Sequence, residues 1–220
     1  WKDNHGTDRR YDLRGDRTNT SLFLEHNVIL GGFTLSAGVL ANRNTGLDGD
    51  FRFYPGVDLS YRPNEMWKFY ASWNKALRVP TYTDLYTSNS VQQGDTGLRP
   101  ERTSTFKAGT RFRTRGVEAV VSGFYSKGND IIDWVYETEE SRKYHAMNIG
   151  KLDNMGYSVD ATLNMTELLP GSFVTRIKAG YARIHQRHTT EQPVYRSLYA
   201  LEYLRHKATF QLDHRIWSRL

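Results

Sequence analysis

The sequence has no cysteine and no long hydrophobic run. Among its 220 residues Cys is absent, which excludes disulfide frameworks, thiolate zinc sites and cysteine nucleophiles. No apolar run approaches the roughly 18 residues that a membrane-spanning helix needs. Hydrophobic residues make up 38% and glycine adds 18 residues, about 46% together, which matches the roughly 45–50% of folded domains. The composition is therefore not that of a disordered chain, and a membrane role would have to come from strands.

Hydrophobic and polar residues alternate along nearly the whole chain. Trp67, Phe69, Ala71 and Trp73, for example, occupy every second position of one segment. This period of two predicts strands with one apolar and one polar face. Many of these segments reach ten residues or more, which is long for a strand of a soluble sheet. This length fits the roughly 9–11 residues of a strand that crosses a bilayer. The alternating segments are 21–30, 33–42, 51–62, 67–74, 104–113, 117–126, 156–165, 173–183 and 206–217. We therefore predict an all-β protein, an antiparallel meander of about nine long strands.

The connections between these segments alternate between short and long. Short ones lie at 31–32, 62–65, 114–116 and 167–172, and long ones at 43–50, 78–102, 127–144 and 184–196. Tight turns on one side and long loops on the other are typical of outer-membrane barrels. Aromatic residues near the predicted strand ends would form the interfacial girdles of such a barrel: Phe51, Phe53, Tyr61, Trp67, Tyr195, Tyr199 and Trp217. The alternative is a soluble β-sandwich or up-and-down barrel with ordinary hairpins.

Two motifs resemble those of TonB-dependent outer-membrane receptors. The first runs Arg-Val-Pro-Thr-Tyr-Thr-Asp-Leu-Tyr over 78–86 and continues Gly-Asp-Thr-Gly-Leu-Arg-Pro-Glu over 94–101. The second has Tyr144, then Asn-Ile-Gly-Lys at 148–151, Gly156 and Asp160. The residues that match the family pattern are Arg78, Pro80, Asp84, Leu85, Tyr86, Gly94, Leu98, Pro100, Glu101, Asn148, Gly150 and Gly156. Thr96, Gly97 and Lys107 depart from it, which affects the subfamily and the local loop geometry.

The residues of the first motif also have a physical meaning of their own. Pro80 and Pro100 lack an N–H donor and would end a ladder of hydrogen bonds where a strand leaves the sheet. Gly94 and Gly97 would permit the positive φ of tight turns. The four charged residues of the segment would pin the two ends of the long loop together: Arg78, Asp84, Arg99 and Glu101.

The resemblance implies a fold and a function. Members have a 22-stranded barrel, an N-terminal plug domain and a short box that couples to the TonB complex. Residues 1–220 would then be a partial barrel, without the plug domain and the last strands. The implied function is binding and active import of a bulky, scarce nutrient such as a siderophore, cobalamin or a glycan, in the outer membrane of a Gram-negative bacterium. The implied partners are outer-membrane lipid, the plug of the same full-length chain, the TonB complex and the nutrient ligand. A passive porin-like barrel and a soluble or surface β-sheet adhesin remain alternatives.

Long loops are where such a receptor would contact its ligand. Amphipathic aromatic and amide side chains suit polar ligands, so we expect contacts from Tyr82, Tyr86, Gln92, Gln93, Trp134, Tyr136 and Tyr144. Each of them is also a candidate for a girdle or for loop packing.

The polar faces of the predicted strands carry more Lys and Arg than Asp and Glu. Ten basic residues are Arg52, Arg62, Lys68, Lys107, Arg111, Arg113, Arg176, Lys178, Lys207 and Arg215, against Glu25, Asp58, Glu118, Asp160 and Asp213. The difference, 10 − 5 = +5, accounts for most of the net charge of +6. We therefore expect the basic excess to line the lumen, where it would pair with plug carboxylates or attract an anionic ligand.

Other chemistry finds little support in the sequence. His185 and His188 would point to opposite faces of a strand, which is a poor arrangement for a metal. A hydrolase would need Ser, His and an acid on one face, and Ser122 and Ser126 have no His of the right parity beside them. The basic residues are spread over alternating strands, without a nucleic-acid-binding motif. We expect no enzyme activity, no cofactor, no metal site and no nucleic-acid partner.

Overall fold

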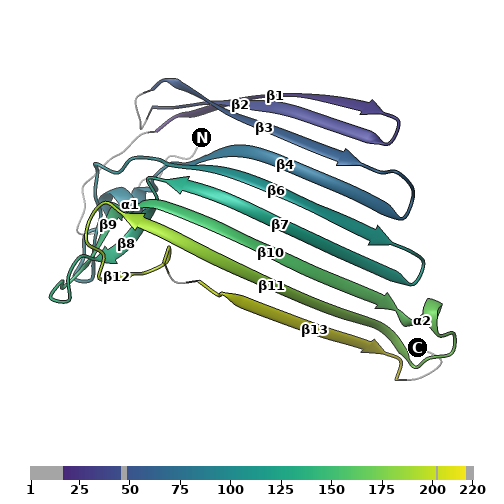
Figure 1. Cartoon of the computed structure of the whole chain (residues 1–220). Helices are drawn as coiled ribbons and strands as arrows, with labels where there is room; N and C mark the ends of the chain where they lie inside the picture. Colours follow the sequence, from purple (N-terminus) through teal and green to yellow (C-terminus); the bar gives the residue numbers. More distant parts are fainter. Residues whose placement is uncertain (1–16, 46–48, 202, 217–220) are drawn as a thin grey trace.

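Nine long strands form one antiparallel sheet in the part of the chain that the structure describes. This structure is a computed structural model that describes residues 17–45, 49–201 and 203–216. The order of strands follows the sequence, interrupted only by short elements that belong to a second, small sheet (Figure 1). The nine strands are β1 (Asn19–Leu30), β2 (Phe33–Asn44), β3 (Phe51–Tyr61), β4 (Trp67–Arg78), β6 (Glu101–Arg113), β7 (Val117–Asn129), β10 (Gly150–Asn164), β11 (Val174–Thr190) and β13 (His206–His214). The predicted meander of nine strands is confirmed.

The hydrogen-bonded register holds over whole strands. β4 pairs with β6 from Trp67 opposite Phe112 to Arg78 opposite Glu101, twelve residues without a bulge. Residues directly opposite each other in an antiparallel pair share a face of the sheet. The apolar positions of neighbouring strands therefore lie side by side, and one face of the whole sheet is apolar.

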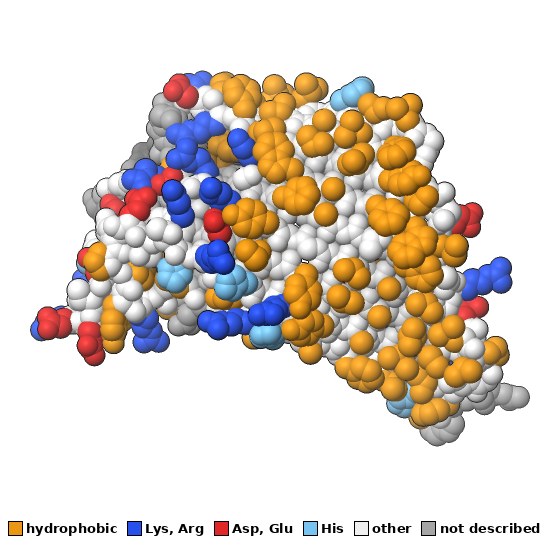
Figure 2. All heavy atoms as spheres, in the orientation of Figure 1, with side chains coloured by type: hydrophobic (Ala, Val, Ile, Leu, Met, Phe, Trp, Pro, Cys, Tyr) orange, Lys and Arg blue, Asp and Glu red, His pale blue; other side chains and the backbone are white. Residues whose placement is uncertain are grey.

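That apolar face is the exposed, outer surface of the sheet. One cross-strand row consists of Thr110, Val121, Val159 and Tyr181. Val121 and Val159 are 44% and 42% exposed although they lie near the middle of the sheet. Figure 2 shows hydrophobic side chains as a broad band over this outer face. We call it the apolar band. From Leu163 to Met155 on β10 it spans eight residues, or about 26 Å, close to the roughly 25 Å apolar height of an outer-membrane barrel.

Aromatic residues lie along the edge of the band next to the short turns. The rings of Phe33 and Tyr61 stack at 4.1 Å, and Trp67 packs against Phe112 at 4.8 Å. This is a girdle at the membrane interface, as predicted for Tyr61 and Trp67. Two expected members, Tyr195 and Tyr199, lie instead in the loop between β11 and β13, and Trp217 is outside the described residues.

The helices of the chain are short. Helix α1 (Tyr82–Tyr86) lies in the loop between β4 and β6, and α2 (Met165–Leu168) lies between β10 and β11. Among the residues that the structure describes, no helix has the length and apolar character needed to cross a membrane.

Several predicted boundaries were wrong. β7 continues to Asn129, β10 already begins at Gly150, and β11 runs to Thr190. The expected loop 184–196 is thus strand for its first half, and the connection is 191–205. The expected loop 127–144 contains a strand, β8 (Ile132–Tyr136). A second strand, β9 (Tyr144–Asn148), begins at the last residue of that expected loop. The upper ends of these strands lie beyond the apolar band, where both faces are polar and the alternation that marked the strands disappears.

The orientation of the apolar band predicts opposite effects for neighbouring positions on β10. Val159→Arg would put a charge at mid-height of the lipid-facing surface, which costs about 2–4 kcal/mol in a membrane barrel. Ser158→Arg, one residue earlier on the inner face, is the matched control and should cost much less. The measurement is urea-dependent unfolding of the gene product in phospholipid bilayers. Equal losses for the two variants would contradict the assignment of faces.

Candidate functional site

Three connections meet at the end of the sheet opposite the short turns. We define the loop cap as residues 79–100, 130–149, 191–201 and 203–205. It contains a small sheet with the strand order β12-β8-β9-β5, in which β5 (Gln92–Gln93) and β12 (Arg196–Ser197) are the edges. These elements gather at one end of the molecule in Figure 1. Segments that are far apart in the sequence are therefore held in one folded unit.

The loop cap has a hydrophobic core of its own. Alternate residues of β8 point to opposite sides of the small sheet, so that two clusters form. Val135 is fully buried and Ile149 is 1% exposed. One cluster consists of Leu98, Ile132, Trp134 and Ala146, and the other of Ile131, Val135, Ile149 and Leu152. The buried hydrophobic residues among those described all belong to these two clusters, because the large sheet turns its apolar side chains outward.

Charged residues of the first motif fasten the loop cap to the sheet. Arg78 and Glu101 are the last residue pair of the β4–β6 ladder, and their side chains lie 2.7 Å apart. The Glu101 carboxylate also accepts a hydrogen bond from the Ile132 backbone N–H at 2.8 Å. Arg78 further contacts Asp84 at 3.4 Å, and Asp84 caps α1 by exchanging hydrogen bonds with Thr81. Of the four charged residues expected to pin the loop, Arg78 and Glu101 join its two ends, Asp84 contacts Arg78 at the same end, and Arg99 binds Asp130 of another loop instead.

The second motif contributes an equivalent link. The Asn148 amide accepts from the Arg99 backbone N–H and donates to the carbonyl oxygens of Arg99 and Asp130, at 2.7–2.9 Å. The Asp130 carboxylate binds Arg99 and Arg102, each at 2.8 Å. Burial by itself would raise the pKa of Asp130, but hydrogen bonds and positive charge from Arg102 and Arg99 outweigh it and lower that pKa. Asp130 therefore stays ionised between its two arginines.

A third link holds the loop 191–205. Asp133 is 1% exposed, and its carboxylate accepts hydrogen bonds from the Ser197 hydroxyl and from the backbone N–H groups of Trp134, Tyr199 and Ala200. A buried carboxylate is stable only when its lone pairs are used in this way. The single side chain of Asp133 thus ties β8 to the loop that follows β11.

Two motif glycines are required by space and backbone conformation. Gly150 has φ +106°, and a Cβ atom there would lie 2.5 Å from the Thr189 carbonyl oxygen. Gly94 passes so close to α1 that a Cβ atom would lie 2.8 Å from the Asp84 carbonyl oxygen. The expectation of positive φ at Gly94 and Gly97 was wrong, since neither is among the described glycines with positive φ. At Gly94 the constraint is a close approach of the backbone.

Pro80 and Pro100 lie where the sequence predicted them, at the two ends of the loop. β4 ends two residues before Pro80, and β6 begins directly after Pro100. Pro80 is also among the fully buried side chains, and its carbonyl oxygen accepts a hydrogen bond from Arg17 at 2.8 Å.

The predicted ligand contacts form two separate aromatic pairs. Tyr136 and Tyr144 stack with ring centroids 4.0 Å apart, and Gln92 pairs with Tyr144 along the β5–β9 ladder. Tyr82 and Tyr86 lie together on α1, 6.1 Å apart. Gln93 is exposed at the edge of the small sheet and accepts a hydrogen bond from Ser88.

Trp134 lies deeper than these residues. It is 5% exposed and packs in the core of the loop cap, so the expectation that it contacts a ligand was wrong. In the strand β8 it alternates with the buried Asp133, and hydrophobicity alone does not show which face of a short loop strand is covered.

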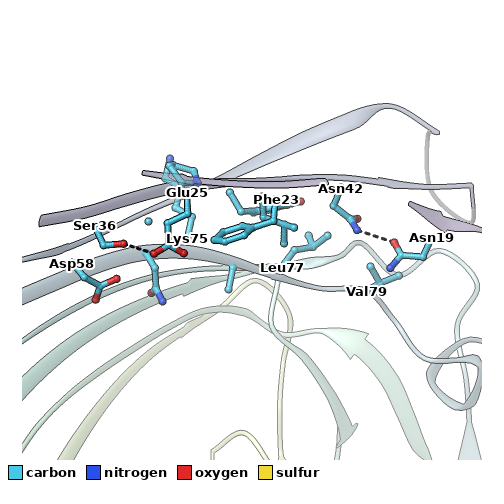
Figure 3. Close-up of a pocket in the computed structure, with 16 residues that line it drawn as sticks. Asn19, Phe23, Glu25, Ser36, Asn42, Asp58, Lys75, Leu77 and Val79 are labelled. Carbon is cyan, nitrogen blue, oxygen red and sulfur yellow. Dashed lines mark hydrogen bonds between the residues drawn. The ribbon is translucent and has the colours of Figure 1, made fainter. Parts of the chain in front are cut away.

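The inner surface of the large sheet contains a hollow lined by polar side chains, such as Asn42 and Asp58, and by apolar ones, such as Phe23 and Leu77. It lies where β3 and β4 separate, because their pairing stops at Gly56 opposite Asn74. Figure 3 shows polar side chains of β1, β2 and β3 directed into it, and Ser36 donates a hydrogen bond to Glu25 at 2.6 Å. No pattern in the sequence predicts this hollow, because it arises from the divergence of two strands.

The inner face is basic as expected, and its charges are partly paired. Arg111 contacts Glu118 at 3.0 Å, and Arg176 contacts Asp213 at 3.8 Å. Other basic residues, however, lie on the outer face beyond the apolar band, contrary to the expectation that the excess lines the lumen. Lys127 and Arg187 lie in the segments 127–144 and 184–196 that were predicted to be loops, and Lys151 and Arg183 lie on the same outer face.

Comparisons with known proteins agree with this geometry. The family model described as TonB dependent receptor-like, beta-barrel, matches residues 2–218. This chain belongs to the TonB-dependent receptor family. The vitamin B12 transporter BtuB of Vibrio vulnificus (strain YJ016) is 30% identical over 78 residues, which are 36% of this chain and 12% of that protein. As a family member, the chain is located in the outer membrane of Gram-negative bacteria.

Solved structures of TonB-dependent receptors share the fold. The copper transporter OprC superposes with a TM-score of 0.69 at 19% identity, covering 90% of this chain and 32% of that chain. The FrpB iron transporter of Neisseria meningitidis (F3-3 variant) gives 0.60 at 23% identity, with 82% and 27% covered. The chain thus spans about a third or less of these transporters, and about an eighth of the matched BtuB.

The loop cap is a folded unit in its own right. Its aromatic pairs stand on short strands and a capped helix that buried carboxylates and two small cores hold in place. Among the residues that the structure describes, no group of three or more His, Asp or Glu side chains is placed to hold a metal ion.

Removing the charge of Asp133 should loosen the loop after β11. Asp133→Asn leaves one acceptor oxygen and turns an NH₂ group toward several donors, and each hydrogen bond lost to a charged group costs about 1.5–3 kcal/mol. Amide hydrogen exchange at residues 197–201 should become at least 10-fold faster, while the large sheet is unaffected. Glu140→Gln, an exposed acid of the same loop cap, is the control. Unchanged exchange in Asp133→Asn would show that the carboxylate does not hold the loop.

Asp130 should make the loop cap sensitive to acid. Because the pKa of Asp130 is lower in the folded protein than in the unfolded chain, its stabilising effect is complete above about pH 4 and is lost as the pH falls through the lower, folded value. Asp130→Asn should weaken the loop cap at neutral pH and remove this part of the acid response. Hydrogen exchange at residues 130–132, corrected for intrinsic rates between pH 3 and 7, measures both effects. An identical pH profile in the variant would refute the assignment.

Proposed function

We propose that this chain forms part of the barrel and of the extracellular loops of a TonB-dependent receptor that binds and actively imports a bulky, scarce nutrient. The observation that carries the proposal is the loop cap. It places two aromatic pairs above a lipid-facing sheet, with Tyr86 exposed and Tyr82, Tyr136 and Tyr144 half-buried, on a base fastened by the two motifs that resemble those of the family. Siderophores, cobalamin and glycans are the ligand classes we consider, and the three similar proteins above are named as transporters of vitamin B12, copper and iron.

We further propose that residues 1–220 are a partial domain whose sheet closes with other strands of the same protein into a 22-stranded barrel. In the described part of the chain, β1 and β13 each pair on one side only, and open edges of this length are prone to aggregate. The matched structures are about three times as long as this chain. The plug domain, and the TonB complex that would act on it, are then partners through regions outside this sequence.

The role of the barrel is to hold the loop cap and present its side chains to the ligand, and not to perform covalent chemistry. Binding energy would come from the aromatic and amide side chains of the loop cap, namely Tyr82, Tyr86, Gln92, Gln93, Tyr136 and Tyr144. Energy from the proton gradient of the inner membrane, delivered through the TonB complex, would then move the plug and open a path. The inner basic face would meet the plug along this path.

Uptake by intact cells tests active import. Cells carrying the complete gene should accumulate a radiolabelled ligand from a panel of ferric siderophores, cobalamin and oligosaccharides. Accumulation should saturate and should cease when an uncoupler collapses the proton gradient. Uptake that persists with the uncoupler would contradict active import and would favour the passive, porin-like alternative.

Variants of the stacked tyrosines test the binding surface. Tyr144→Ala removes the ring that Tyr136 stacks on, and aromatic residues at the centre of a binding surface often contribute more than 1 kcal/mol, so affinity should fall about 10-fold. Tyr195→Ala is the matched control, because Tyr195 is 59% exposed in the same loop cap. Equal affinities for the two variants would place ligand contacts elsewhere.

A further inference from the structure

The hollow between β3 and β4 is a concave site of the size that small molecules occupy. Its volume is about 470 Å³, within the roughly 300–1,000 Å³ of sites that bind small ligands. The pairing of the two strands stops at Gly56 opposite Asn74. Beyond this point Leu77 and Val79 line the hollow from the side of β4, and β1, β2 and β3 line it from the other side (Figure 3).

Two glycines leave the floor of the hollow open. Gly38 and Gly56 are opposite each other in the β2–β3 ladder, and Glu25 and Asn74 stand at the two ends of the same row. A Cβ atom at Gly56 would have its nearest neighbour at 3.6 Å, an ordinary contact distance. At Gly38 a Cβ atom would lie 3.3 Å from the ring of Phe23. A ligand can therefore rest on the backbone at Gly56, beside this ring.

An apolar row borders the floor on the side of the loop cap. Phe23, Leu40 and Tyr54 are opposite one another on three neighbouring strands. Leu40 stands at a polar position in the alternation of β2. Phe23 is 60% exposed although it lines the inner hollow and does not face lipid. Because apolar surface is unfavourable in water, this row suits the apolar part of a ligand.

The opposite border of the floor is acidic. Ser36 donates a hydrogen bond to Glu25 at 2.6 Å and is opposite Asp58 in the ladder, so that two carboxylates converge on one hydroxyl group. Figure 3 shows these three side chains together at one end of the hollow. Elsewhere on the inner face Glu118 and Asp213 contact arginines. Among the residues that the structure describes, neither Glu25 nor Asp58 forms an ion pair.

The hollow therefore has a charge of opposite sign to its surroundings. Lys75 is the basic residue among the described ones that line it, and its ammonium nitrogen lies 5.8 Å from the centre of the Trp73 ring. Two carboxylates thus stand against one ammonium group, whereas the inner face as a whole is basic. A cation that enters the lumen would be repelled by most of the wall and attracted to this place.

We propose that the hollow binds an organic cation with an apolar body, that is, a protonated amine that carries a ring or a short hydrocarbon chain. The ammonium group would lie between Glu25 and Asp58, which can accept charge-assisted hydrogen bonds from it. The apolar body would lie against Phe23, whose ring face also attracts a cation within about 6 Å. This site lies in the wall, apart from the nutrient surface of the loop cap, and has its own ligand.

Three matched probes test the charge of the ligand on the purified gene product in non-ionic detergent. Tryptamine, tryptophol and indole-3-propionate share an indole ring and carry an ammonium, a hydroxyl and a carboxylate group, respectively. In equilibrium dialysis at neutral pH and low salt, tryptamine should bind about 10-fold more tightly than tryptophol. Indole-3-propionate should bind more weakly than both. Equal affinities of tryptamine and tryptophol, or tighter binding of the carboxylate, would overturn the proposal.

Variants of the acidic border test where the cation lies. In Glu25→Gln/Asp58→Asn the preference for tryptamine over tryptophol should fall about 10-fold. Unchanged affinity for tryptophol shows that this variant is folded. The matched control is Asp160→Asn, which removes an exposed carboxylate two residues after Ser158 on the inner face of β10, and it should retain the preference. A preference that survives in the double variant, or that Asp160→Asn removes equally, would overturn the proposal.

A further variant tests the apolar row independently of charge. Phe23→Ser should weaken the binding of tryptamine and tryptophol alike, by about 5-fold, because both lose contact with the ring. Unchanged affinities in Phe23→Ser would contradict the placement of the apolar body. Displacement of tryptamine by maltose, a neutral sugar, would also overturn the proposal, because the hollow would then bind hydroxyl groups and not a cation.

Discussion

The whole structure depends on the unbroken register of hydrogen bonds between neighbouring strands. Because each residue lies opposite a residue of the same face, the period of two in the sequence becomes a sheet with an apolar outer surface. A shift of one residue in a single pair would turn its side chains to the wrong face. Backbone groups in lipid have no water to bind, so the ladder must be complete wherever the sheet meets the membrane. The inverted distribution of hydrophobic residues follows from that requirement.

Above the membrane the same strands serve a different purpose. Outside the lipid, hydrophobic and polar residues of the strands no longer need to alternate. Charged side chains there hold the loops in place. Arg78 and Glu101 are the last residue pair of the β4–β6 ladder, and the Glu101 carboxylate binds the backbone of β8, which pairs with β9. Asp130 and Asp133 hold the neighbouring loops. Ion pairs whose arginines are about half exposed, as here, add little stability, but they fix position, since a carboxylate accepts only from correctly placed donors. The proposed ligand surface stands on this base.

Most of the large sheet could be predicted from the sequence, but only part of the loop cap. All nine long strands were found because a lipid-facing strand has a clear alternation, as in the segment from Trp67 to Trp73. Of the charged residues in the first motif, Arg78 and Glu101 join the ends of their loop as expected, whereas Arg99 binds Asp130 of another loop. Asp133 was missed, although a charge inside the apolar run Ile-Ile-Asp-Trp-Val is a signal for a buried, satisfied carboxylate. Trp134 was misassigned, because a tryptophan in a loop can face either the core or a ligand.

The sequence by itself determined the class of the fold, the faces of the membrane strands and the family, because each rests on local periodicity or on short motifs. Only the tertiary structure decided where the strands end, which loops share a core and which charges meet. Lys127, Asp153 and Arg187 are far apart in the chain and form one row through the register of three strands. Such contacts depend on pairing between distant segments, whereas a periodic pattern reports only the environment of one strand at a time.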